Sequence, residues 1–347
     1  MAKPALNIAL QGGGSHGAFA WGILDGLLEE DRFDIAAITA TSAGAMNAVV
    51  CADGLRTGGN AGAREALARF WQKISTTRGP FSPVSLNAIR KAFDPFGLFK
   101  AASFQWFDAL TSVASPYEFN PWNFNPLRDS LQDVVDFEGL TKDPPFKLFI
   151  AATNVKSGRA KVFRTHEVSA DVTLASACLP YLFQAVEVNG EAYWDGGYAG
   201  NPSLMPLITE SPADDLLLVQ INPIERSERP TSASDILGRI SEVTFNASLL
   251  KEMRSIALLK QMMAEEGRPG HQYRNPQFRR VDALRVHLID GGASLAPLEP
   301  TSKSNTQWTF LQQLHALGRA SAEQWLAAHA QDLGQRSSWD LHPMLVP

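Results

Sequence analysis

A glycine-rich segment directly after the first apolar run is the earliest candidate for chemistry in this sequence. Leu6 to Leu10 has the length and composition of a strand, and the segment that follows it includes Gly12-Gly13-Gly14-Ser15-His16-Gly17. Glycines let the backbone approach a ligand closely, and the N–H groups at the start of a helix attract negative charge. The segment therefore predicts a site that stabilises an anion. Read as Gly-x-Gly-x-x-Gly, it also matches the fingerprint of dinucleotide-binding proteins.

Ser42 is the candidate nucleophile. It stands in Ala40-Thr41-Ser42-Ala43-Gly44, where a predicted strand over residues 35 to 39 passes into a predicted helix. A nucleophilic serine on such a tight turn needs small neighbours, because bulky side chains would block both the turn and the approach of substrate. A serine at the start of a helix can also be an ordinary N-cap, so its position alone leaves both interpretations open.

Asp195 is the candidate partner for this serine. Asn189-Gly190 favours a tight hairpin turn, and the strand after it leads into Trp194-Asp195-Gly196-Gly197. Alone, Asp-Gly-Gly is more often a turn than a site. Together, the three segments place an anion-binding loop, a nucleophile and a carboxylate at the ends of predicted strands, which is where open α/β sheets bind their ligands.

Apolar periodicity predicts that strands and helices alternate around these segments. Helices are expected over residues 18 to 28, 42 to 50, 61 to 74, 169 to 178, 236 to 264 and 308 to 330. Further strands are expected over residues 146 to 153, 161 to 164, 186 to 188, 191 to 194, 216 to 221 and 286 to 289. This order predicts an α/β fold with one catalytic unit.

The composition argues against several other classes of protein. The net charge of -5, with both signs interspersed, leaves no basic stripe that could follow nucleic acid. Cys51 and Cys178 lie in apolar stretches, so neither a disulfide framework nor a metal site is expected. No apolar run approaches the ~20 residues needed to cross a bilayer, and no signal peptide is predicted. We expect a cytoplasmic protein without metal or cofactor, whose contact with a membrane would be peripheral.

Four segments, in this order, resemble the patatin-like phospholipases of bacteria. They are the loop at residues 12 to 17, the Gly-x-Ser-x-Gly-like turn at Ser42, the segment Ala175-Ser176-Ala177-Cys178-Leu179-Pro180, and Asp195-Gly196-Gly197. The resemblance covers residues 6 to 208. It departs from the family at two positions, because Ala40 replaces the first glycine of the turn and His16 stands where Arg or Lys is usual.

The resemblance implies a serine esterase or lipid acyl hydrolase with a catalytic dyad. Ser42 would be the nucleophile and Asp195 its base, and the oxyanion hole would be formed by Gly12, Gly13, Gly14 and Ser15. The supporting positions would be Ala40, Gly44, Gly17, Gly196 and Gly197. In such a dyad the carboxylate takes the serine proton directly, and water later cleaves the acyl-enzyme. A carboxylate near its reference pKa of about 3.9 is a weak base, so the oxyanion loop is expected to lower much of the barrier.

The resemblance also implies a fold and a division of the chain. The fold would be a three-layer α/β/α sandwich around a mainly parallel central sheet, with a catalytic domain over residues 6 to 208. An aromatic-rich insertion at residues 80 to 125 would form either an acyl-chain pocket or cap, or part of the core. Residues 209 to 347 would form a C-terminal extension packed on the same unit. The expected partner is a lipid or another ester, nucleic acid is not expected, and the oligomeric state is left open.

Two other interpretations stay open at this point. An α/β-hydrolase triad also uses a serine on a small-residue turn, but it needs a late histidine, for which the candidates are His287, His315, His329 and His342. A nucleotide-binding module would use Gly12 to Gly17. It needs an acidic residue after the second strand, which instead ends in Thr39-Ala40-Thr41-Ser42. We therefore expect carboxylic ester hydrolysis by the Ser42 and Asp195 pair.

Overall fold

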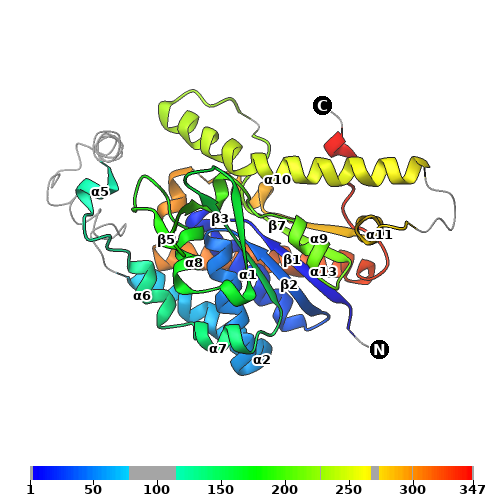
Figure 1. Cartoon of the computed structure of the whole chain (residues 1–347), viewed down its shortest axis with the longest axis horizontal. Coiled ribbons are helices and arrows are strands. Elements are labelled where there is room, and N and C mark those ends of the chain that lie inside the picture. Colours follow the sequence, from blue (N-terminus) through cyan, green and yellow to red (C-terminus); the bar gives the residue numbers. More distant parts are fainter. Residues whose placement is uncertain (1–2, 78–114, 227, 267–272, 299, 346–347) are drawn as a thin grey trace.

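An eight-stranded sheet runs through the centre of the molecule (Figure 1). The computed structural model describes residues 3 to 77, 115 to 226, 228 to 266, 273 to 298 and 300 to 345. Most of the aromatic-rich insertion expected at residues 80 to 125 therefore lies outside the described residues. Its described end contains the short helix α5 (Pro116–Phe119).

Most of the sheet is parallel. The parallel strands are β1 (Ala5–Leu10), β2 (Asp34–Ala40), β3 (Lys147–Asn154), β7 (Asp215–Gln220) and β8 (Arg285–Asp290). The antiparallel strands are β4 (Ala160–Arg164), β5 (Val186–Val188) and β6 (Glu191–Asp195). The order is β5-β6-β3-β2-β1-β7-β8, with β4 also paired to β3. The predicted α/β fold with a mainly parallel sheet is confirmed.

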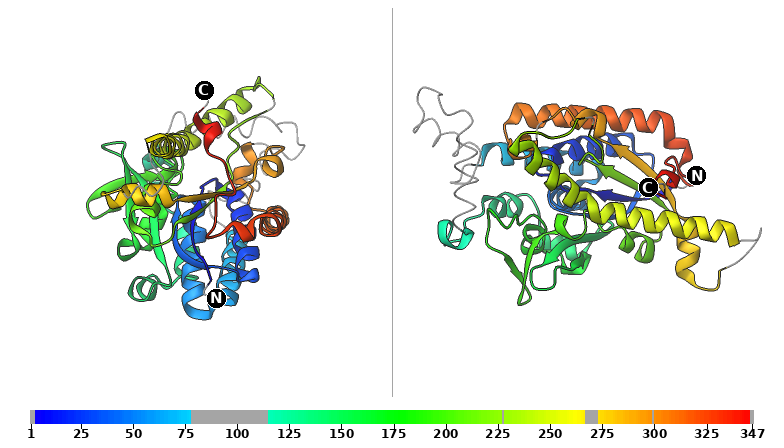
Figure 2. Two further views of the ribbon diagram at one scale, coloured as in Figure 1. Left: turned by 90° about the vertical axis from the view of Figure 1, so that its right-hand side faces the viewer. Right: turned by 90° about the horizontal axis from the view of Figure 1, so that it is seen from above.

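Each face of the sheet packs against its own layer of helices (Figure 2). Successive side chains of a strand point to opposite faces, so a strand covered on both faces reads as one apolar run. In β7, Leu217 and Val219 belong to one core cluster, while Leu216 and Leu218 belong to the other. The first layer contains α1 (Gly17–Glu30), α2 (Ala43–Thr76), α8 (Ala170–Ser176) and α13 (Trp308–His329). The second contains α9 (Met205–Glu210), α10 (Ala233–Glu266) and α11 (Pro276–Ala283).

The local predictions hold with small changes of boundary. The two helices expected over 42 to 50 and 61 to 74 form the single span α2, which is interrupted where Gly58 and Gly59 leave helical geometry. Asn189 and Gly190 both adopt positive φ, 52° and 79°, as the predicted hairpin turn requires. Several short helices were not predicted from the sequence. They include α5, α9 and α11, and also α6 (Pro126–Gln132), α7 (Phe137–Lys142) and α12 (Gly292–Leu295).

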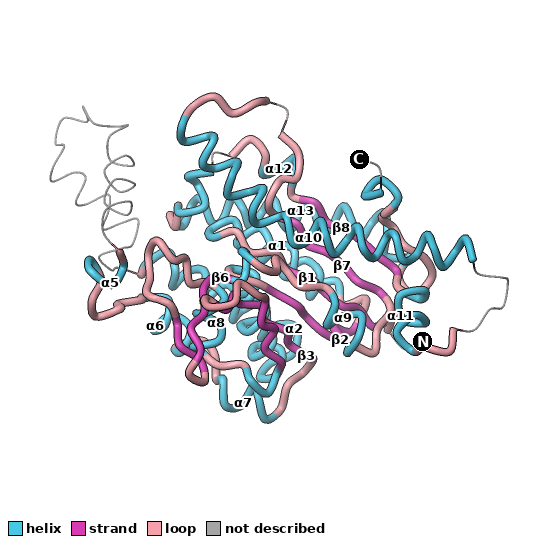
Figure 3. Tube along the Cα trace, turned by 45° about the horizontal axis from the view of Figure 1, so that its top comes forward, coloured by secondary structure: helices cyan, strands magenta, loops and turns pink. Residues whose placement is uncertain are grey.

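Residues beyond 208 are part of the same sheet and core. Strand β7 pairs with β1, and β8 pairs with β7, so the three strands lie side by side (Figure 3). Helix α13 crosses α1 closely at Gly22 and Gly318, where an added Cβ would collide with the backbone of the opposite helix. The C-terminal part of the chain therefore supplies the strand next to β1 and covers α1. Among the described helices, none combines the length and the apolarity that crossing a bilayer requires.

Candidate active site

Ser42 lies at the turn between β2 and α2 in a backbone conformation that is rare for serine. Its φ is 54° and its ψ is -125°. A non-glycine residue at positive φ is strained and keeps that conformation only when its surroundings hold it. The Ser42 hydroxyl caps no N–H group of α2. The interpretation of this serine as an ordinary N-cap is therefore wrong.

Neighbouring elements hold the turn in place. The Ser42 N–H donates to Ser176 Oγ at 2.9 Å, and Ser176 Oγ donates to the Ala151 carbonyl oxygen at 2.6 Å. A Cβ on Gly44 would lie 2.6 Å from the carbonyl oxygen of Leu10, so only glycine lets α2 start this close to β1. These contacts connect the turn to β1, β3 and α8.

Two further predicted supports also lie at this turn. A Cβ on Gly17 would come within 2.6 Å of Ala43 Cβ, because α1 and α2 begin beside each other. Ala40 is the fully buried last residue of β2. Both residues therefore lie in the immediate surroundings of Ser42.

Asp195 reaches the same place from an antiparallel strand. It ends β6 opposite Ala152 of β3, and its side chain is 0% exposed. The next residue, Gly196, leaves no room for a Cβ because the Ala151 carbonyl oxygen and the Thr41 side chain lie against it. Asp195 is therefore packed beside the turn that carries Ser42.

Burial sets the protonation of Asp195. It raises the pKa of this carboxyl from 3.8 to about 7, although the Gly197 N–H and the Ser42 hydroxyl act in the opposite direction. The Gly197 N–H donates to Oδ1 at 2.7 Å, whereas Oδ2 has no hydrogen bond of ordinary geometry from any described residue. The expectation that this carboxyl has a pKa near 3.9 is wrong, because burial removes the carboxylate from solvent and disfavours its charged form.

The glycine-rich loop follows β1 and begins with a residue whose polar groups are already bonded. The Gly12 N–H donates to Asn201 Oδ1 at 2.7 Å, and the Gly12 carbonyl accepts from Asn222 Nδ2 at 2.6 Å. Gly12 therefore has no N–H to offer an oxyanion. Within the described part of the chain, the N–H groups of Gly13, Gly14 and Ser15 have no acceptor.

A layer of buried amide side chains lies beneath this loop. Gln11 Nε2 donates to Asn246 Oδ1 at 3.0 Å, and Gln11 Oε1 accepts from the N–H groups of Ile221 and Asn222. None of the motifs in the sequence predicted this layer. One signal was present, because Gln11 and Asn222 are polar residues that follow apolar strands at the same edge of the sheet.

His16 carries no charge at this loop. Burial, more than the nearby Lys303, lowers the pKa of His16 to about 3, so the ring is neutral at pH 7. Its Nε2 atom pairs with Ser302 Oγ at 2.8 Å. The position where the family usually has Arg or Lys is therefore uncharged here.

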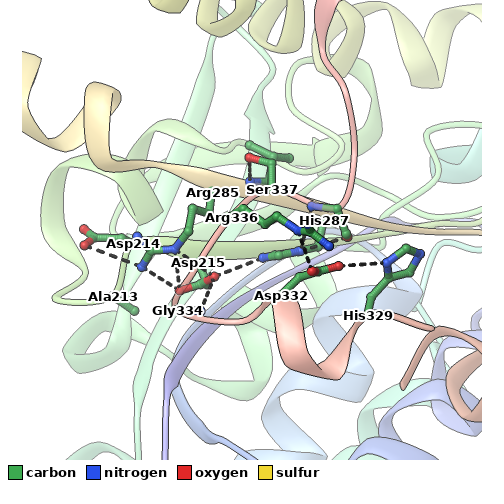
Figure 4. Close-up of polar contacts among 12 residues, drawn as sticks. Ala213, Asp214, Asp215, Arg285, His287, His329, Asp332, Gly334, Arg336 and Ser337 are labelled. Atoms are coloured by element: carbon green, nitrogen blue, oxygen red, sulfur yellow. Dashed lines mark hydrogen bonds and ion pairs between the residues drawn. The ribbon is translucent and has the colours of Figure 1, made fainter. Parts of the chain in front are cut away.

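His287, a histidine proposed for the alternative triad, is held by a carboxylate at the start of β7. His287 Nε2 pairs with Asp215 Oδ1 at 3.0 Å, and Asp215 also binds Arg285, so the carboxylate lies between two donors (Figure 4). Asp215 begins β7, whereas Ser42 follows the end of β2, and these strands run in the same direction. This Asp and His pair therefore cannot serve Ser42.

The other three histidines proposed for the triad also have no hydrogen bond to Ser42 within the described part of the chain. His315 pairs with Asp25 between α13 and α1, and His329 pairs with Asp332. His342 lies in the short helix η6 (His342–Leu345). Among the described residues, no histidine is hydrogen-bonded to Ser42.

Comparison with known proteins gives one family. The sequence matches patatin-like phospholipase over residues 8–208, which is more than half of the chain. No curated protein matches it. Among solved structures, VipD from Legionella pneumophila is 14% identical, with 91% of this chain and 67% of that chain covered and a TM-score of 0.34. A chain in the complex of SpcU with ExoU from the type III secretion system of Pseudomonas aeruginosa is also 14% identical. The match covers 96% of this chain and 80% of that chain, with a TM-score of 0.29. The chain belongs to the patatin-like phospholipase family, whose members are lipid acyl hydrolases.

Proposed function

We propose that this protein is a serine esterase that cleaves carboxylic esters of lipids through a dyad of Ser42 and Asp195. The observation that carries the proposal is the strained Ser42, whose hydroxyl caps no helix and lies beside a buried carboxylate. A serine hydroxyl becomes a useful nucleophile when an adjacent group accepts its proton. The burial of Asp195 beside the turn that carries Ser42 supports Asp195 as that group, and a dyad requires no histidine.

The proposed reaction has two halves. The ionised Asp195 takes the proton of Ser42 while Oγ attacks the ester carbonyl carbon, and the carbonyl oxygen becomes an oxyanion. When the tetrahedral intermediate collapses, the leaving alcohol receives that proton from Asp195, and the acyl group stays on Ser42. Asp195 then takes a proton from water, which attacks the acyl carbon and forms a second tetrahedral intermediate. When this intermediate collapses, Asp195 returns the proton to Ser42 Oγ, the carboxylic acid leaves, and the ionised carboxylate and the free serine are restored.

The oxyanion would be stabilised by backbone N–H groups of the glycine-rich loop. With Gly12 bonded to Asn201, the donors that remain are the N–H groups of Gly13, Gly14 and Ser15. Losing one such donor typically costs ~3 kcal/mol of transition-state stabilisation. A base with a pKa near the working pH combines a useful ionised fraction with proton affinity, so the burial of Asp195 also favours the reaction.

We also propose that the protein works in the cytoplasm. Cys51 and Cys178 are both buried free thiols, and burial raises the pKa of each to about 12. Buried thiols of this kind are unreactive, and unpaired cysteines are usual in reducing compartments. Secretion with a disulfide formed between the two cysteines would contradict this proposal.

The decisive experiment is Ser42→Ala with a fluorophosphonate probe and a soluble nitrophenyl ester. We expect labelling and hydrolysis to disappear while the fold is retained, because the change removes one hydroxyl and little packing. Ser169→Ala is the matched control. Ser169 is an ordinary N-cap whose hydroxyl accepts from the Val172 N–H at 3.2 Å. Its replacement should lower the free energy of unfolding by about 1 kcal/mol and leave fluorophosphonate labelling unchanged. Labelling that persists in Ser42→Ala would exclude Ser42 as the nucleophile.

Headgroup and acyl length are separate questions within this proposal. A hydrolysis profile across nitrophenyl esters, lysophospholipids, phospholipids and hydroxyalkanoate esters separates simple esterase from phospholipase activity. A protein that labels at Ser42 but cleaves only short soluble esters would keep the dyad and exclude a phospholipid substrate.

A further inference from the structure

The glycine-rich loop is supported by a segment almost three hundred residues later in the chain. The short helix η4 (Pro300–Ser304) packs against the loop, and the backbone carbonyl of Lys303 fills the space that a Cβ on Gly14 would need. Ser302 pairs with His16 in the same contact. The C-terminal part of the chain therefore touches the candidate oxyanion site directly.

Lys303 also reaches beneath the loop with its side chain. Its Nζ atom donates to Asn222 Oδ1 at 2.8 Å. An ammonium group only donates, so it fixes the Asn222 amide with Oδ1 toward the lysine and Nδ2 toward the loop. Nδ2 then donates to the Gly12 carbonyl oxygen at 2.6 Å. The result is a chain of hydrogen bonds from a cation to one peptide group of the loop.

That peptide group contains the N–H of Gly13. In a trans peptide the C=O bond and the N–H bond of the next residue lie in one plane and point in opposite directions. Because Asn222 holds the Gly12 carbonyl, the Gly13 N–H must point away from the Asn222 side chain. Asn201 restrains the other side of Gly12 by accepting its N–H at 2.7 Å. The orientation of the Gly13 N–H is therefore determined before any substrate binds.

We infer that Lys303 is a positioning residue for the oxyanion hole, and that it acts through Asn222 to orient and polarise the Gly12–Gly13 peptide. This inference rests on the proposed esterase function. Hydrogen bonds in a chain polarise one another, and a charged first donor strengthens the effect. Pulling electron density toward the Gly12 oxygen makes the Gly13 N–H a better donor to a developing negative charge.

The other charged groups near the loop do not act on the Gly12–Gly13 peptide in this way. Glu242 is nearly fully buried and pairs with Arg226 and Arg239, so its charge is already balanced by two guanidinium groups. Burial lowers the pKa of His16 to about 3, so that ring adds no charge. Among the described cations, Lys303 is the one hydrogen-bonded to a side chain that holds the loop.

The test compares Lys303→Met, which removes the charge and the donor, with Lys303→Arg, which keeps both. With p-nitrophenyl butyrate we expect Lys303→Met to lower kcat about tenfold, less than the 10²- to 10³-fold typical when a donor is lost, with KM nearly unchanged. Lys303→Arg should keep most of kcat. An unchanged kcat, or a change confined to KM, in folded Lys303→Met would overturn the inference.

Lys260→Met is the matched control for loss of a buried lysine. Lys260 donates to the backbone carbonyls of Val281, Asp282 and Leu284, on the side of α10 that packs against α11. This control should lower the melting temperature and leave kcat unchanged. A loss of kcat in Lys260→Met equal to that in Lys303→Met would mean a general structural effect and would overturn the inference.

A double variant tests whether Lys303 acts through Asn222. If it does, adding Lys303→Met to Asn222→Leu should cost little more kcat than Asn222→Leu alone, because the relay is already broken. Full additivity would overturn the relay. Should Lys303→Met fail to fold, Lys303→Gln replaces it, since its amide keeps the hydrogen bond and loses the charge. Wild-type kcat in Lys303→Gln would then exclude polarisation by the lysine.

The two hypotheses fail in different ways. If the wild-type protein neither hydrolyses the ester nor labels at Ser42, the proposed function is wrong, and the oxyanion role of Lys303 is excluded with it. If the wild type is active and Lys303→Met matches it, only the inference about Lys303 is wrong.

Discussion

Replacing Asp195 by asparagine tests both the base and its burial. The amide keeps the shape of the side chain and can still accept the Gly197 N–H at Oδ1, but it cannot take the proton of Ser42. Positioned general bases usually contribute 10²- to 10⁴-fold to the rate, so we expect ester turnover to fall by about that much. The folded structure should be retained, because the amide has nearly the size and shape of the carboxyl and its oxygen still accepts the Gly197 N–H.

Asp195→Asn should be more stable than the wild type at pH values above the ordinary pKa of an aspartate, and about equally stable below it. Burial raises the pKa of Asp195 from 3.8 to about 7, while in the unfolded chain it ionises at its ordinary value. Between these values the unfolded state loses a proton that the folded state keeps, so stability falls by ~1.4 kcal/mol per pH unit. Over about three units this amounts to ~4 kcal/mol above pH 7, and asparagine avoids that cost. Near pH 4 both side chains are neutral in the folded protein, and the difference should almost vanish.

Thermal unfolding at pH 5 and pH 8 provides the assay. We expect the melting temperature of Asp195→Asn to exceed that of the wild type by about 3–6 °C at pH 8, and by much less at pH 5. Ser42→Ala is the control, because it abolishes turnover but keeps the buried carboxyl. Its stability should therefore fall with rising pH at least as steeply as that of the wild type, since the Ser42 hydroxyl acts to lower the pKa of Asp195. A difference between wild type and Asp195→Asn that is the same at both pH values would refute the raised pKa.

The pH profile of the wild type, the Gly13 position and the Asp215 carboxyl each give one further prediction. Because Asp195 must be ionised to act as base, kcat/KM of the wild type should rise with pH, reach half its maximum near pH 7 and then level off; a profile that is flat from pH 5 to 8 would exclude a base with this pKa. Gly13→Ala should lower kcat at least about tenfold with little change in KM. Its Cβ would lie 2.8 Å from Ile221 Cδ1, which is too close for an ordinary contact, and we expect the loop to move away from Ile221. Steady-state kinetics measure the effect, and an unaltered kcat would exclude the Gly13 N–H from the oxyanion hole. Burial by itself would raise the pKa of Asp215, but hydrogen bonds from His287 and Arg285 outweigh it and lower that pKa to about 2. The stability this provides is complete above pH ~4 and is lost toward pH 2, so Asp215→Asn should cost about 2 kcal/mol at pH 6 and progressively less as the pH falls, as denaturant unfolding would show.

The sequence by itself determined the features that depend on neighbouring residues. Apolar periodicity located the strands and the long helices, and Asn189-Gly190 specified a hairpin, because side-chain spacing and φ preferences act over a few residues. The small residues around Ser42 likewise predicted a tight turn, which is the turn observed. Their grouping in one order along the chain was enough to indicate the family.

Only the tertiary structure decided the electrostatics and the distant supports of the site. The pKa of Asp195 depends on how much water the fold removes from it, which a strand pattern cannot show. The antiparallel direction of β6 places this residue beside Ser42, and no local signal specified that direction. Asn222 and Lys303 lie more than two hundred residues after Gly12, and a polar residue after a strand or in a short helix looks like many others in sequence. Their roles arise because the parallel sheet brings the ends of β1, β2 and β7 to one edge, where hydrogen bonds form between residues that sequence spacing does not relate.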